Sequence, residues 1–142
     1  FLSLVTALRA ETRQRRLQLW VAVHPSHART PDPDHPAQSI FDATLAQADH
    51  VVTMAYRNEV SAALEFAAPL LGALARSETP WHFGVTTQPG EKARPHSYSG
   101  VSADAFCAAM AALDQGLRAT AAGRTYRGLA IHHFTPTAAI LS

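Results

Sequence analysis

Neutral hydrogen-bonding side chains stand at or near the ends of four strand-like runs in this sequence. They are His24 in the first run, Tyr56 in the second, Thr86 and Gln88 in the third, and His132 in the fourth. Such groups donate and accept hydrogen bonds without a permanent charge, as the recognition of sugar hydroxyl groups requires. Arg57, directly after Tyr56, adds a cation. We therefore expect these six side chains to bind a saccharide or another small polar ligand.

Carboxyl groups do not occupy these strand ends. Glycoside hydrolysis usually needs two of them, roughly 5–10 Å apart across the scissile bond. Glu59 falls in the first turn of a predicted helix, where an acid complements the helix dipole. Asp32, Asp34 and Glu91 fall in predicted loops, and we interpret them as solvated surface groups. The catalytic residues are therefore left unknown, and no cofactor is predicted.

A metal site is the competing interpretation of the histidines. His24, His27, His132 and His133 include enough imidazoles for zinc. However, His27 falls in a predicted loop, and strand alternation points His133 away from His132. No carboxylate or cysteine completes the set, so we predict no metal.

The elements that must position these side chains follow from hydrophobic spacing and turn residues. Helices are predicted over 1–16, 37–48, 59–75 and 102–122, and loops over 26–37 and 89–100. Asn58 suits a helix N-cap, Pro69 predicts a kink or a break, and Gly123 suits a C-cap. Strands are predicted over 17–25, 49–57, 81–88 and 128–134.

This alternation of helices and strands predicts parallel strands joined by right-handed crossovers. Each strand has one face of branched aliphatic residues and one face of Trp, Ala, Gly, Met, Tyr, His or Thr. A doubly wound sheet would show continuous aliphatic strands, so the pattern favours the C-terminal half, strands 5–8, of a (β/α)8 TIM barrel. The alternative is a small four-stranded parallel α/β sheet. Trp20 and Trp81 could supply stacking, but Trp20 lies low in its strand and Trp81 begins one, so both are interpreted as core residues.

Composition limits the function classes. The 142 residues make one domain at most, and they carry 47% hydrophobic but only 16% charged residues, which suits a chain partly covered by more protein. A net charge of +1 argues against nucleic-acid binding, and no apolar run reaches the ~20 residues of a membrane span. The single Cys107 excludes an internal disulfide and is interpreted as a buried helix residue. Both ends interrupt helical patterns, so residues 1–142 are predicted to be a partial barrel domain.

Three of the runs carry a family resemblance. They are Met54-Ala55-Tyr56-Arg57, Gly84-Val85-Thr86-Thr87 and Gly128-Leu129-Ala130-Ile131-His132-His133-Phe134. Over residues 17–136 the chain resembles the C-terminal half of an uncharacterised bacterial family of glycoside-hydrolase-like barrels in the chitinase-type superfamily. The resemblance implies a saccharide cleft, an exported bacterial protein, and catalytic acids in an N-terminal half that these residues do not include.

The sequence departs from that pattern at two positions. Arg57 stands where the chitinase pattern has an aspartate after the tyrosine, and Thr86 stands where related barrels have a glutamate. These substitutions keep open a second hypothesis, a non-catalytic saccharide-binding or scaffold barrel. On either hypothesis the chain alone is expected to be inactive. It is also expected to pair with the remaining half-barrel or with a second copy.

Overall fold

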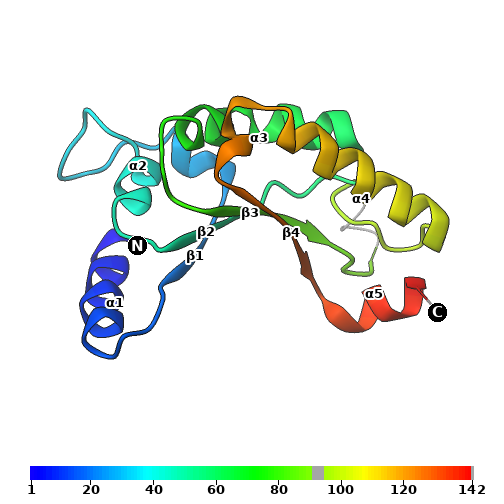
Figure 1. Ribbon diagram of the computed structural model, residues 1–142, viewed down its shortest axis with the longest axis horizontal. Helices are drawn as coiled ribbons and strands as arrows, with labels where there is room; N and C mark the ends of the chain where they lie inside the picture. The colour runs from blue at the N-terminus through cyan, green and yellow to red at the C-terminus, as the bar shows by residue number, and fades with distance from the viewer. Residues whose placement is uncertain (91–94, 142) are drawn as a thin grey trace.

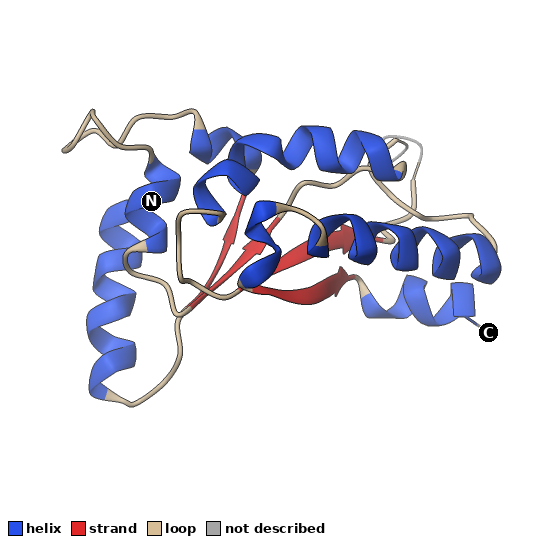
Figure 2. Ribbon diagram, turned by 45° about the horizontal axis from the view of Figure 1, so that its top comes forward, coloured by secondary structure: helices blue, strands red, loops and turns tan. Residues whose placement is uncertain are grey.

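The computed structural model describes residues 1–90 and 95–141 of the chain. Its centre is a four-stranded, all-parallel sheet with flanking helices (Figures 1 and 2). The strands are β1 (Trp20–Val23), β2 (His50–Thr53), β3 (Trp81–Thr86) and β4 (Tyr126–His132), and they lie side by side in chain order. The predicted α/β class and parallel pairing are confirmed, and the observed sheet fits the four-stranded α/β alternative.

The helices are α1 (Leu2–Gln14), α2 (Ile40–Leu45), α3 (Val60–Leu74), α4 (Ala103–Arg118) and α5 (Phe134–Leu141). Single 3-10 turns follow β1 at Pro25–Ala28 and precede β4 at Ala121–Arg124. Figure 1 shows α2, α3 and α4 on one side of the sheet, with α1 and α5 at opposite ends of the molecule. The opposite sheet face has no helix across it among the described residues. We call this surface the open face.

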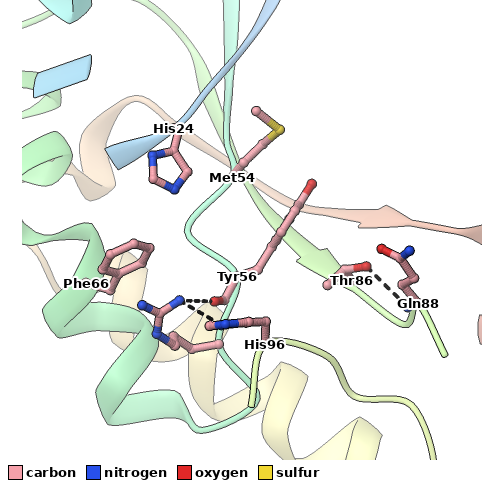
Figure 3. A pocket seen from close by; sticks show the side chains of 8 residues that line it. His24, Met54, Tyr56, Phe66, Thr86, Gln88 and His96 are labelled. Atoms are coloured by element: carbon pink, nitrogen blue, oxygen red, sulfur yellow. Dashed lines mark hydrogen bonds between the residues drawn. The ribbon is translucent and has the colours of Figure 1, made fainter. Parts of the chain in front are cut away.

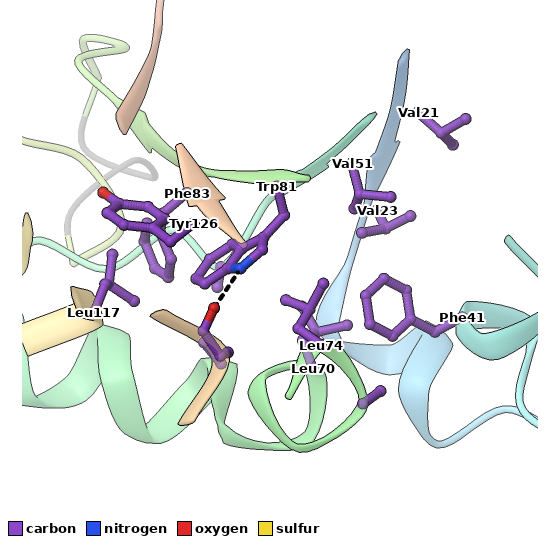
Figure 4. Packing of buried hydrophobic residues seen from close by; sticks show 14 of the residues in the cluster. Val21, Val23, Phe41, Val51, Leu70, Leu74, Trp81, Phe83, Leu117 and Tyr126 are labelled. Atoms are coloured by element: carbon purple, nitrogen blue, oxygen red, sulfur yellow. Dashed lines mark hydrogen bonds between the residues drawn. The ribbon is translucent and has the colours of Figure 1, made fainter. Parts of the chain in front are cut away.

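The core lies between the sheet and the covering helices, as strand alternation predicts (Figure 4). Val23, Val51 and Phe83 point toward α3, where Leu70 and Leu74 are also buried. Trp81 is completely buried, and its Nε1–H donates to the carbonyl oxygen of Ala122 at 3.0 Å. The core assignment of Trp81 is therefore confirmed.

The prediction that Trp20 is a core residue is wrong, because 48% of its surface is exposed. It lies on the open face, where its ring stacks on His50 and His82 at centroid distances of 4.1 and 4.9 Å. Strand alternation predicts that Trp20 faces away from Val21 and Val23, and the burial pattern of β1 confirms this. The core assignment was wrong because alternation says which face a residue occupies and not whether that face is covered.

Several element ends differ from the predictions because side-chain caps decide them. Glu59, not Asn58, caps α3 by accepting hydrogen bonds from the backbone N–H groups of Ser61 and Ala62. The helix then continues through Pro69 to Leu74 without a break. Helix α2 is shorter than expected, since Ser39 and Asp42 form a capping box at its start.

Two further predictions concern helix α4 and the turn that follows it. Helix α4 ends at Arg118, so Gly123 is not its C-cap and lies in the following 3-10 turn. A Cβ there would approach the Arg118 carbonyl oxygen to 2.2 Å, so the close backbone contact requires glycine. Cys107 is exposed on α4 rather than buried, because it points away from the sheet-facing side that buries Phe106.

Within the described ranges, no helix is long and apolar enough to cross a membrane.

Candidate functional site

A pocket of about 420 Å³ opens at the carboxyl ends of β1, β2 and β3 (Figure 3). Five of the six predicted binding residues line it, namely His24, Tyr56, Arg57, Thr86 and Gln88. The sixth, His132, does not line it, but its Nδ1 lies 3.2 Å from the Tyr56 hydroxyl oxygen. The remaining lining residues are Met54, Phe66 and His96.

Tyr56, Thr86 and His132 lie together because of the sheet register. Thr86 pairs with His132 across β3 and β4, and Tyr56 follows the end of β2, three residues beyond Thr53. The Tyr56 and His132 rings stack with centroids 6.0 Å apart. Partial burial raises the pKa of the Tyr56 phenol, so this hydroxyl stays protonated and able to donate at neutral pH. Strand alternation predicts that the side chains of Tyr56 and His132 share one face of the sheet, and the contact between them confirms this.

Gly84 makes room for the Tyr56 ring. It lies on β3 on the same face as Thr86, two residues away. A Cβ at this position would meet the Thr53 carbonyl oxygen at 2.6 Å and Tyr56 Cε1 at 3.2 Å. The tyrosine therefore lies directly over a position where the sheet presents only backbone.

Hydrogen bonds hold the segment from residue 95 to 98 against the end of β3. The Ser97 hydroxyl lies within hydrogen-bond distance of the carbonyl oxygens of Gln88, at 2.7 Å, and Thr86, at 3.2 Å. The Tyr98 N–H donates to the Thr86 carbonyl at 2.9 Å. The Thr86 hydroxyl in turn accepts from the backbone N–H of Gln88 at 3.2 Å. These contacts bring His96 to the pocket.

Arg57 joins the strand end, α3 and this loop. Its guanidinium carbon lies 3.7 Å from the centroid of the Phe66 ring, and Nη1 donates to the Tyr56 carbonyl at 2.6 Å. The same nitrogen donates to His96 Nδ1 at 3.0 Å. His24 meets Phe66 from another side, edge to face, at 5.8 Å. Phe66 thus spaces the arginine and one histidine around the pocket.

Sequence reasoning missed three of the pocket-lining residues, Met54, Phe66 and His96. Met54 shares the alternation of Tyr56 and could have been selected from that signal. Phe66 lies one turn from the buried Ala63 and Leu70 and reads as an ordinary helix residue. His96 lies in the predicted loop 89–100, and nothing in its local pattern indicates contact with Arg57.

Hydrogen bonding fixes the proton positions on two of the imidazoles. The backbone N–H of Ser26 donates to His24 Nδ1 at 3.2 Å, and the Arg57 guanidinium donates to His96 Nδ1. A backbone N–H group and a guanidinium group can only donate. Both Nδ1 atoms are therefore acceptors, and in the neutral rings both Nε2 atoms carry hydrogens.

The acids lie elsewhere. None of the eight lining residues in Figure 3 is acidic. Glu59 is occupied as the cap of α3, and Glu91, Lys92 and Arg94 lie outside the described residues. Among the residues that the structure describes, no group of three or more His, Cys, Asp or Glu side chains could hold a metal ion.

The prediction that Asp32 is a solvated surface acid is wrong, because only 3% of its surface is exposed. Its carboxylate accepts from the Asp34 N–H at 3.0 Å and lies 3.2 Å from His35 Nδ1 and 3.4 Å from Gln38 Nε2. The hydrogen bond from Asp34, followed by those from the other two, lowers the pKa of Asp32. Asp32 lines a separate cavity of about 530 Å³ beside α1, where its bonding organises the loop.

Comparisons with protein-family models, curated proteins and solved structures gave no match to this chain.

Proposed function

We propose that the pocket binds a saccharide or a similar polyhydroxyl ligand, and that these residues supply binding rather than acid catalysis. The observation that carries the proposal is the composition of the lining. His24, Tyr56, Thr86 and Gln88 offer neutral donors and acceptors at one strand edge, without a carboxylate among the described lining residues. This is the inventory that hydroxyl groups need, and it lacks the acid pair that glycoside hydrolysis uses.

We further propose that the sheet is one half of a (β/α)8 barrel of the glycoside-hydrolase-like kind that the sequence resembles. The support comes from three features: strands in chain order, α2–α4 on one face only, and a site at the carboxyl ends. On this proposal the open face is the barrel interior, and further strands or a second copy cover it. Catalytic acids, where the complete assembly has them, come from that other half.

The binding proposal is tested by titrating the purified chain with neutral mono- and oligosaccharides, using calorimetry or NMR. Tyr56→Phe removes only the hydroxyl and is expected to weaken binding. Stability should change by no more than about 1 kcal/mol, the usual net contribution of one hydrogen bond. The matched control is Tyr126→Phe, at a tyrosine that packs against Trp81 on the helix-covered face.

Two outcomes would count against the proposal. One is unchanged affinity in Tyr56→Phe beside an unchanged control. The other is a loss of stability well above 1 kcal/mol, which would make the Tyr56 hydroxyl a structural group rather than a ligand contact.

A further inference from the structure

The Arg57 guanidinium is a fixed positive charge at the pocket wall. Its Nη1 hydrogens are directed to the Tyr56 carbonyl and to His96, while its planar face lies on Phe66. Within the described ranges, Arg57 has no carboxylate within ion-pair distance, although Arg9, Arg15, Arg118 and Arg124 each have one. The guanidinium is therefore held in a fixed position at the pocket wall, and none of the described carboxylates acts as its counter-ion.

The imidazoles around Arg57 reinforce this polarity. The hydrogen bonds to their Nδ1 atoms leave His24 and His96 with Nε2–H groups, which are donors. The Tyr56 hydroxyl can donate as well. A lining that combines a guanidinium with several N–H and O–H donors favours a ligand carrying negative charge, because charge-assisted hydrogen bonds to a guanidinium are about twice as strong as neutral ones.

We propose that the ligand is an anionic saccharide, whose carboxylate, phosphate or sulfate group binds Arg57 while its hydroxyl groups contact the neutral residues. The inference rests on the saccharide-binding function proposed above and specifies the class of sugar.

Four ligands separate the possibilities: glucose, glucuronate, glucose 6-phosphate and inorganic phosphate, each titrated into the wild-type chain at low ionic strength. We expect glucuronate or glucose 6-phosphate to bind at least about tenfold more tightly than glucose, the range for a hydrogen bond to a charged group. Whichever of the two binds more tightly identifies the source of the charge. Added salt should reduce that preference, since it screens the partly exposed cation.

Arg57→Gln should abolish the preference, so that glucuronate and glucose 6-phosphate bind no more tightly than glucose does to the same variant. Arg57→Lys keeps the charge without the planar fork and should retain part of it. The matched control is Arg76→Gln, which removes the same charge from the far end of α3, where Arg76 donates to the Gly72 carbonyl. The comparison of ligands on the wild-type chain decides the question even if a variant does not fold.

The titrations distinguish a failure of the anionic-saccharide proposal from a failure of the saccharide-binding proposal. Equal affinity for glucose and both anionic sugars would overturn the anionic preference and leave saccharide binding in place. Binding of inorganic phosphate as tight as that of glucose 6-phosphate would overturn the saccharide function and reduce the site to an anion site. Binding of none of the four would overturn both proposals.

Discussion

Replacing Gly84 with alanine tests whether the sheet and the pocket depend on the same close contact. The added Cβ would lie 2.6 Å from the Thr53 carbonyl oxygen, below the 3.0 Å that real Cβ atoms essentially never breach. Thr53 is a buried residue of β2, and its carbonyl is backbone, so it cannot move without shifting the strand. Tyr56 Cε1, at 3.2 Å, must give way as well.

The free energy follows from two opposing terms. Overpacking of this kind costs about 1–3 kcal/mol. Alanine also restricts the unfolded chain, which contributes about 0.4–1 kcal/mol in the opposite direction. We therefore expect Gly84→Ala to lower the free energy of unfolding by about 1–2 kcal/mol. Because the Tyr56 ring must move from its place beside His132, ligand affinity should fall too.

Urea denaturation measures the first effect. With an m-value of about 2 kcal/mol/M, the midpoint should fall by roughly 0.5–1 M without a change in m. The control is Gly72→Ala in α3, where a Cβ would meet nothing within 4 Å. There the helix should gain about 0.5–1 kcal/mol, the usual difference between the two residues. A Gly84→Ala midpoint equal to or above that of the wild type would refute the reasoning.

Three other predictions concern the two faces of the sheet. Trp81→Ala should cost about 3–5 kcal/mol of unfolding free energy, and Trp20→Ala only about 1 kcal/mol, the value of a stacked pair; similar losses in urea melts would mean that the open face is covered. Burial lowers the pKa of His82 from 6.5, and the charges of His50 and Arg127 lower it further. The unfolded chain therefore binds more protons than the folded chain as the pH falls below 6.5. The free energy of unfolding should therefore drop between pH 7.5 and 5.5, and less in His82→Phe; parallel pH profiles would contradict this. Finally, the chain should self-associate, because Trp20 is exposed and the outer edges of β1 and β4 pair with no further strand among the described residues. A monodisperse monomer in sedimentation with a sharp melt would contradict the half-barrel proposal.

The pairing of strands and the division of their side chains into two faces could be predicted from the sequence. Alternation is a property of the extended backbone, so it assigned Val23 and Val51 to one face and His24 and Tyr56 to the other before any packing was known. The parallel order follows from the intervening helices. For the same reason, residues at the strand ends were expected to gather, and five of them line one pocket.

Only the tertiary structure decided what covers each face and what reaches the pocket from outside the strands. Trp20 and Trp81 have similar local patterns, but one is exposed and the other buried because all three covering helices pack on one side. Phe66 and His96 contact Arg57 through the crossing of α3 and the fastening of residues 95–98 to β3. Such contacts join residues distant in the chain, and neither periodicity nor capping carries information about them.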